Sequence, residues 1–262
     1  MIEWRHVPSI LDAGPAPRAA IGLVALASDV VSEPELRRFL PPEGVGLYAN
    51  RIPMPEHATV ETLTAMGDSI DRVVDGLVPD IPLDVIAYGC TAAATMLGSA
   101  TLAARVRARR ATPVGYSDPF LAGVVGLRAL GLRRIAMLTP YEDPVGDVVA
   151  GHFADAGFTL VRGASFKRRG DPDMSRIPPA AIARAAIELG RARDVDGVFI
   201  SCTALRVSPV LARIERAIAK PVVSSNQALA WHCLRLAGDR EALSDRGCLF
   251  GVSALLPDGV NP

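Results

Sequence analysis

The sequence predicts an α/β protein of two doubly wound lobes, related by pseudo-twofold symmetry and built on mainly parallel sheets. Strand-like apolar runs alternate with helical patterns along most of the 262 residues, which is typical of parallel sheets covered by helices on both faces. Half of the residues are hydrophobic, enough to fill a large core. An internal repeat also divides the chain, because Asp84–Ala92 and Asp196–Ala204 have nearly the same sequence.

In each copy of the repeat, an aspartate precedes a short apolar run, and a small residue then leads into Cys-Thr-Ala. Apolar runs that begin at Ile21 and Ile135 lie at similar distances upstream of the two copies. Downstream, Thr112–Ser117 resembles Lys220–Ser225, and a helical stretch follows each. Ligands of such sheets bind beyond the carboxyl ends of the strands, so the matched strand ends predict one active site in the cleft between the lobes.

The remaining elements follow from hydrophobic periodicity and turn residues. The predicted strands lie at 20–27, 45–50, 83–88, 112–116, 134–139, 158–162, 196–201 and 220–224, with a short one near 248–253. The predicted helices lie at 33–40, 57–77, 92–109, 119–131, 143–156, 178–193, 208–218 and 227–237. The first helix has a capping serine, Ser32, and a proline in its first turn, a common helix start.

We assign residues 1–117 and 227–262 to the first lobe and residues 118–226 to the second. Residues 1–17 are aperiodic and predict an extended arm. Two proline-containing segments, 140–144 and 171–179, are expected to form loops over the cleft.

Composition excludes several classes of protein. Lysine plus arginine and aspartate plus glutamate both number 28, so the net charge of zero does not favour nucleic-acid binding. The start of the chain does not resemble a signal peptide, and the chargeless stretch 85–104 is too polar for a convincing membrane span. We therefore expect a cytoplasmic protein without a membrane partner. The four cysteines lack the spacing of a zinc site, so we predict no metal and free thiols.

The cysteines of the repeat, Cys90 and Cys202, are the predicted catalytic residues. Each follows a buried strand and precedes a threonine and a predicted helix, and a helix N-terminus favours both a thiolate and a bound carboxylate. One thiolate can remove a proton from a carbon while the opposite thiol returns one. Alternatively, one thiolate can add to a double bond and allow rotation about it. Neither route needs a cofactor. Cys233 and Cys248 are expected to be structural.

A carboxylate substrate is expected to bind at the same turns. Asp29, which lies at the end of the first strand, is a further candidate for contact with the substrate. The other predicted binding groups are the backbone amides of Thr91, Ala92, Thr203 and Ala204 and the hydroxyls of Thr91, Thr203 and Tyr141.

From about Ala20 to Ser253 the chain resembles the aspartate/glutamate racemase superfamily. Within it, the chain is similar to the branch that holds maleate cis-trans isomerases, arylmalonate decarboxylases and ectoine-utilisation protein A. The resemblance implies a cofactor-independent enzyme, often a homodimer, with two thiols flanking a small carboxylate substrate. The segments on which the resemblance rests are Gly22–Asp29, Tyr88–Thr91, Leu138–Tyr141, Ser201–Thr203 and Pro221–Ser225.

Departures from the family pattern bear on the substrate. Decarboxylase members keep only the second cysteine, so retention of both implies racemase or isomerase chemistry. Maleate isomerases usually carry asparagine where this chain has Asp29, which resembles the ectoine-utilisation type. An aspartate there would repel one carboxylate of maleate and could bind an amino group. Ala92 replaces a common serine, and Asp171 or Asp173 replaces a loop asparagine.

Three functions remain open from the sequence. The leading hypothesis is a two-cysteine racemase or isomerase of an amino-acid-like or N-acyl-amino-acid-like carboxylate. The second is maleate-type cis-trans isomerisation through a covalent cysteine adduct. The third is a non-catalytic carboxylate-binding protein on the same scaffold.

Overall fold

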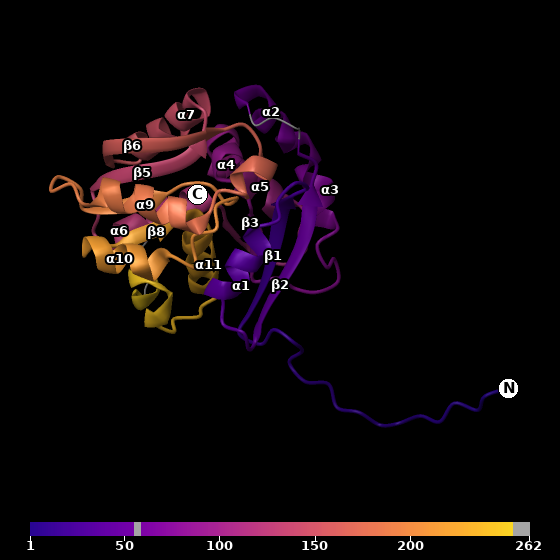
Figure 1. The fold of residues 1–262 in the computed structure, drawn as a ribbon. Helices are drawn as coiled ribbons and strands as arrows, with labels where there is room; N and C mark the ends of the chain where they lie inside the picture. Colours follow the sequence, from indigo (N-terminus) through magenta and orange to yellow (C-terminus); the bar gives the residue numbers. More distant parts are fainter. Residues whose placement is uncertain (55–58, 254–262) are drawn as a thin grey trace.

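The computed structural model describes residues 1–54 and 59–253, which form two four-stranded parallel sheets of the same topology (Figure 1). The first sheet has the order β2-β1-β3-β4 and the second β6-β5-β7-β8. This confirms the predicted pair of doubly wound α/β lobes. The strands are β1 (Ala19–Leu26), β2 (Val45–Ile52), β3 (Val85–Tyr88), β4 (Gly115–Ser117), β5 (Arg134–Tyr141), β6 (Thr159–Arg168), β7 (Gly197–Ile200) and β8 (Val222–Ser224).

Helices cover both sheets and fill the space between them (Figure 1). The α-helices are α1 (Ser32–Phe39), α2 (Val60–Ala65), α3 (Ile70–Asp75), α4 (Thr91–Leu97), α5 (Ser99–Ala108), α6 (Pro119–Ala129), α7 (Asp143–Asp155), α8 (Asp171–Met174), α9 (Pro179–Gly190), α10 (Leu211–Ile218) and α11 (Ser225–Leu236). Short 3-10 helices are η1 (Met66–Ser69), η2 (Ser244–Arg246) and η3 (Cys248–Gly251). Within the described residues, no helix is long and apolar enough to span a membrane.

The repeated aspartate has the same structural role in both lobes. A carboxylate oxygen of Asp84 accepts a hydrogen bond from the amide of Ala20 at 2.7 Å, at the start of β1. A carboxylate oxygen of Asp196 accepts one from the amide of Arg134 at 2.7 Å, at the start of β5. Each aspartate thus ties the beginning of one strand to the neighbouring central strand, which explains why the residue recurs.

The downstream match is shifted by two residues from the predicted one. The side chain of Asp118 caps α6 by accepting from the amide of Leu121, and that of Ser224 caps α11 by accepting from the amide of Gln227. These two caps end the last strand of each sheet, so Asp118 is the counterpart of Ser224. Side-chain oxygens are favoured here because they satisfy amides in the first turn of a helix.

Two predicted helices are divided in the structure. The helix predicted at 92–109 is broken into α4 and α5 at Gly98, whose φ of 82° is unfavourable for other residues. The helix predicted at 57–77 comprises α2, η1 and α3, and its first two positions lie outside the described residues.

The short strand predicted near 248–253 is wrong, because this segment forms η3. Side chains bind two of the backbone groups of residues 248–253. The carboxylate of Glu215 accepts from the amide of Cys248 at 3.1 Å, and the indole of Trp231 donates to the carbonyl of Val252 at 2.9 Å.

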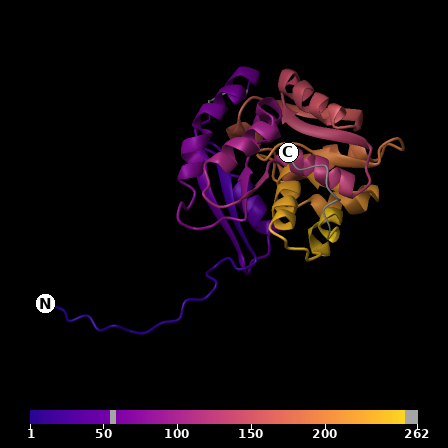
Figure 2. The same cartoon turned by 180° about the vertical axis from the view of Figure 1, so that it is seen from behind.

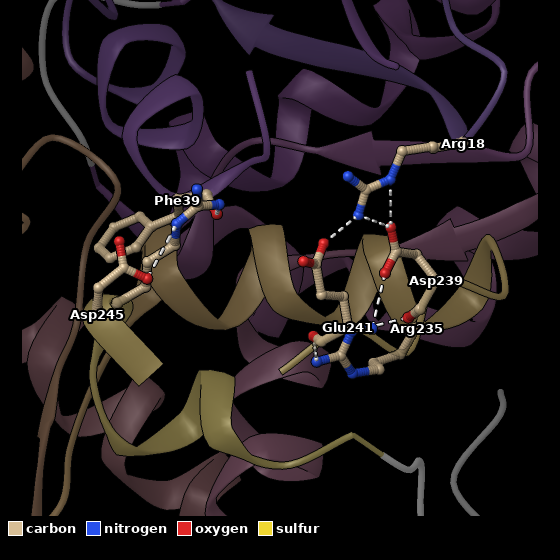
Figure 3. A network of polar contacts seen from close by, with 7 residues as sticks. Arg18, Phe39, Arg235, Asp239, Glu241 and Asp245 are labelled. Carbon is tan, nitrogen blue, oxygen red and sulfur yellow. Dashed lines mark hydrogen bonds and ion pairs between the residues drawn. The ribbon is translucent and has the colours of Figure 1, made fainter. Parts of the chain in front are cut away.

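Arginines fasten the segment after α11 to the body of the protein (Figure 3). Arg18 forms ion pairs with Asp239 and Glu241, both at 2.6 Å. The buried Arg235 donates to the carbonyl oxygens of the same two residues at 2.7 and 2.9 Å. Arg18 precedes β1 directly, so the segment is anchored at the amino-terminal edge of the first sheet.

Helix α11 lies where the two lobes meet. It contacts α1, β3 and β4 on one side and α6 and β8 on the other. Residues 1–17 extend away from the body as the predicted arm, which Figure 2 shows from the opposite side. The domain boundaries at residues 117 and 226 stay a prediction.

Replacing Gly197 by alanine should destabilise the protein. A Cβ atom on this first residue of β7 would lie 2.7 Å from a methyl carbon of Leu132 and 2.8 Å from the carbonyl oxygen of Pro221. We expect Gly197→Ala to lower the free energy of unfolding by about 1–3 kcal/mol, as overpacking does. Urea titration would measure it. Gly151→Ala in α7 is the control, because a Cβ there meets nothing within 4 Å, and an equal loss in both variants would contradict the explanation.

Candidate active site

The two cysteine turns lie at the carboxyl ends of β3 and β7, where these strands meet the opposite lobe. Cys90 and Cys202 are each 7% exposed. The residue before each cysteine donates its amide to the adjacent central strand, Gly89 to Val24 at 2.8 Å and Ser201 to Leu138 at 2.9 Å. A Cβ on Gly89 would lie 3.1 Å from the Val24 carbonyl oxygen. The small residue of the repeat thus lets the turn lie against the neighbouring strand.

Hydrogen bonds across the lobes hold the two turns together. The hydroxyl oxygen of Ser225 accepts from the hydroxyl of Thr91 at 2.9 Å and from the amide of Cys202 at 3.0 Å. In the other direction, the hydroxyl of Thr203 donates to the carbonyl of Gly89 at 3.0 Å. Both threonine hydroxyls therefore donate their hydrogen within the protein, and their expected role in binding substrate stays a prediction.

The two cysteines differ in backbone conformation despite the repeat. Cys90 is the N-cap of α4, and its sulfur accepts from the amide of Ala93 at 3.5 Å. Cys202 has a φ of 99°, and its sulfur accepts from the amide of Ala204 at 3.4 Å. Such a φ costs on the order of 1–3 kcal/mol in a residue with a side chain. The surrounding hydrogen bonds offset this cost.

A helix N-terminus lies behind Cys90 only. The expectation that Cys202 also precedes a helix is wrong, because a turn follows it and α10 begins at Leu211. Buried side chains satisfy the backbone of this turn instead. Asn226 donates to the carbonyl of Thr203 at 2.8 Å, and Glu35 accepts from the amides of Val207 and Ser208 at 3.0 and 2.8 Å.

Asp29 lies in the turn between β1 and α1 and is 4% exposed. One carboxylate oxygen, Oδ1, accepts from the amides of Val31 and Ser32 at 2.7 and 2.9 Å, which fixes the start of α1. The other oxygen, Oδ2, is buried and has no hydrogen-bond partner among the described residues. A buried carboxylate oxygen without a partner is costly and marks a place where a ligand can bind.

Asp171 brings a second carboxyl group to the site from α8. Its Oδ2 accepts from the hydroxyl of Ser28 at 2.6 Å, and the residue is 7% exposed. Burial raises the pKa of Asp171, the hydrogen bond from Ser28 lowers it in part, and the nearby Asp29 raises it again. In the same helix, the sulfur of Met174 lies 4.0 Å from that of Cys202. Helix α8 therefore covers the second thiol.

Both thiols are protonated at neutral pH in the free protein. Burial, aided by the charges of Asp171 and Asp29, raises the pKa of Cys90 to about 12, although the amide of Ala93 lowers it in part. Burial and then Asp171 raise the pKa of Cys202 well above its ordinary value. Catalysis by either sulfur requires that something bound in the site offset these effects.

Tyr141 ends β5 beside the second thiol and is 4% exposed. Burial raises the pKa of its hydroxyl well above the usual value, so the group stays neutral and can donate a hydrogen bond. A hydrogen bond from Tyr141 lowers the pKa of Cys202 in part.

The structure brings the predicted residues to the carboxyl edges of the sheets. Asp29 follows β1, and Tyr141 ends β5. Cys90, Thr91 and Ala92 follow β3, and Cys202, Thr203 and Ala204 follow β7. Among the described residues, no group of three or more histidine, cysteine, aspartate or glutamate side chains is placed to hold a metal ion.

Sequence reasoning missed Ser28, Glu35, Met174 and Ser225. The burial of Glu35 could have been predicted from the sequence, because it lies on the same helix face as the buried Leu36 and Phe39. The other cysteines lie elsewhere, Cys233 buried in α11 and Cys248 exposed.

Fold and site together define an α/β protein of two duplicated lobes, with a buried cysteine at a matched strand end of each. The sequence profile of the arylmalonate decarboxylase family matches residues 34–250. The chain belongs to this family, which confirms the resemblance to arylmalonate decarboxylases and maleate isomerases, and it is an enzyme.

Individual relatives carry two activities. The maleate isomerase of Nocardia farcinica is 30% identical over 226 residues, which cover 82% of this chain and 88% of that enzyme. The arylmalonate decarboxylase of Bordetella bronchiseptica is 33% identical over 150 residues, or 56% of this chain, and the match spans only 62% of the decarboxylase.

Solved structures of such enzymes have the same fold. The Nocardia farcinica maleate cis-trans isomerase with a covalently bound succinylcysteine intermediate superposes with a TM-score of 0.78 at 25% identity, covering 88% of this chain and 98% of that one. A liganded variant of arylmalonate decarboxylase superposes with a TM-score of 0.75 at 25% identity, with the same coverage.

The raised pKa of Cys90 predicts a distinctive alkylation profile. Since its pKa is about 12, the rate of its reaction with iodoacetamide in the free protein should rise about tenfold per pH unit up to about pH 10. Peptide mass spectrometry would follow each cysteine, with the exposed Cys248 as internal reference. A plateau of the Cys90 rate near neutral pH would show a thiolate and contradict the prediction.

Proposed function

We propose that this protein is a two-cysteine isomerase that moves a proton at the carbon next to a carboxylate in a small, amino-acid-like substrate. The observation that carries the proposal is the pair of buried thiols, Cys90 and Cys202, on matched strand ends of the two lobes. The strands that precede the two cysteines belong to opposite lobes. A substrate bound between the sulfurs would therefore offer each of them a different face of one carbon.

The proposed proton transfer needs no reactant other than the two cysteines and the substrate. One sulfur, as thiolate, takes the proton from the carbon next to the carboxylate, so that a C–H bond breaks and an S–H bond forms. The electron pair is delocalised into the carboxyl group. The opposite thiol then donates its proton to the other face and becomes the thiolate. Tyr141, as a neutral donor, supports negative charge on Cys202.

Isotope exchange would test this mechanism. In deuterated water, proton NMR of a panel of amino acids and N-acyl amino acids should show loss of the signal of the proton next to the carboxylate. Cys90→Ser and Cys202→Ser should each slow this loss by at least about 10²-fold, the usual contribution of an acid–base group. Cys248→Ser, an exposed control, should match the parent protein. Full activity in both site variants would exclude the proposal.

Maleate-type cis-trans isomerisation is the second candidate, and the succinylcysteine intermediate of the related isomerase favours it. Here a thiolate adds to one alkene carbon, the remaining single bond rotates, and elimination of the thiolate restores the double bond.

This candidate predicts a covalent adduct. Mixing the protein with maleate and quenching in acid should give a mass increase equal to one substrate molecule on Cys90 or Cys202, and fumarate in the NMR spectrum. The Cys248→Ser variant should behave in the same way. If neither adduct nor fumarate forms while proton exchange occurs on an amino acid, the first mechanism is retained.

Three further features belong to the proposal. The resemblance to the racemase superfamily, whose members are often dimers, is the basis for proposing a homodimer, and Asp29 in place of asparagine supports a substrate of the ectoine-utilisation type. We also propose a cytoplasmic location. Because the chain belongs to a family of enzymes, the non-catalytic carboxylate-binding alternative is set aside.

A further inference from the structure

We propose that Asp29 and Asp171 form a subsite for a cationic nitrogen, so that the enzyme selects substrates with one carboxylate and one ammonium group over dicarboxylates. This inference rests on the proposed function, whose substrate class it narrows. Neither carboxyl group moves the proton; the pair determines specificity.

The geometry brings the two carboxyl groups together from different lobes. Ser28, the neighbour of Asp29 in the first lobe, donates to Oδ2 of Asp171 in the second lobe at 2.6 Å. Both acidic residues are buried, at 4% and 7% exposure. Both also act on the thiol of Cys90 through their charge. The pair therefore lies near Cys90, and Asp171 acts on Cys202 as well.

Oδ2 of Asp29 lacks a hydrogen-bond donor. Oδ1 of Asp29 is fully used at the start of α1, whereas Oδ2 is buried without a partner among the described residues. A carboxylate oxygen can only accept hydrogen bonds, and an ammonium group has three N–H bonds to donate. A ligand with a protonated amine would satisfy Oδ2 and balance its charge.

No ion pair with Asp29 or Asp171 occurs among the ion pairs of the described residues. Arg51, which lies close to the Asp29 main chain, donates to the backbone carbonyl oxygens of Leu26 and Asp29, at 2.8 and 2.6 Å, and pairs with Glu33. The polar contacts of Arg51 thus go to the main chain and to Glu33, and they leave the Asp29 carboxylate available.

Coulomb interactions should make a large difference between the affinities for the two kinds of ligand. In a buried site, the repulsion between like charges and the attraction between opposite charges are both much stronger than in water. A second substrate carboxylate would meet two buried acids here. An ammonium group in the same place would be attracted by both.

An ammonium group would also activate the thiols. Negative neighbours disfavour a thiolate, and the charges of Asp29 and Asp171 raise the pKa of Cys90 in the free protein. A cation bound between them cancels this effect and lowers the pKa of the thiol. A substrate with the correct charge would thus help to create the base that deprotonates it.

Binding measurements separate this inference from the reaction itself. We would titrate the protein by calorimetry with 2-aminobutyrate, alanine and proline, and with succinate and methylsuccinate as the dicarboxylates. In the parent protein at least one amino acid should bind at least about 10-fold more tightly than either dicarboxylate. Asp29→Asn and Asp171→Asn should each weaken amino-acid binding about 10-fold or more, and the double variant should favour succinate.

Asp173→Asn is the matched control, since Asp173 lies in the same short helix but is exposed. Ser28→Ala removes the hydrogen bond to Asp171 and leaves both carboxyl groups, so it provides a second test if an asparagine variant fails to fold. It should reduce the preference for the amino acid without reversing it. Circular dichroism would verify folding.

The alkylation rate of Cys90 gives a readout that a merely structural role would not change. The bound amino acid should shift the pH profile of the Cys90 reaction to lower pH in the parent protein but not in the double variant. Equal affinity for the two ligand classes in the parent, or an unchanged preference in the double variant, would overturn the inference even if isomerisation is observed. Selective amino-acid binding without proton exchange would retain the subsite and reject the proposed reaction.

Discussion

The hydroxyl of Ser225 joins the two halves of the site, and the placement of both thiols depends on it. It accepts from Thr91, which follows the first cysteine, and from the amide of the second cysteine, Cys202. Thr203 completes the link with a hydrogen bond to Gly89. These bonds are buried, where each lost partner costs about 1–3 kcal/mol. They fix the relative position of two turns that belong to different sheets.

The two lobes have the same strand topology, but the two cysteine turns of the site differ in conformation. The aspartates Asp84 and Asp196 make the same hydrogen bond at equivalent strand starts. In contrast, Cys90 begins a helix, whereas Cys202 has a positive φ and is followed by a turn held by buried side chains. Two thiols in unequal surroundings suit a reaction in which one sulfur gives a proton and the other takes one.

Burial and nearby negative charge raise the pKa of both thiols. In the proposed subsite, a ligand that offsets the charge of Asp29 and Asp171 would favour the thiolate, which would couple substrate choice to activation. The relatives that isomerise maleate act on a dicarboxylate. The proposed subsite of Asp29 and Asp171 would give this chain a different ligand preference from these relatives.

The sequence by itself determined the two-lobed fold, the positions of the strands and the two cysteines at matched strand ends, because these follow from apolar periodicity and from a repeat that is visible in Asp84–Ala92 and Asp196–Ala204. Asp29 and Tyr141 could be placed for the same reason, since strand ends of parallel sheets meet at one edge. Only the tertiary structure decided the roles of Ser225, Glu35 and Asp171, the positive φ of Cys202 and the folding of residues 248–251 as a 3-10 helix. Each of these depends on hydrogen bonds between residues far apart in the chain, which local sequence patterns do not encode.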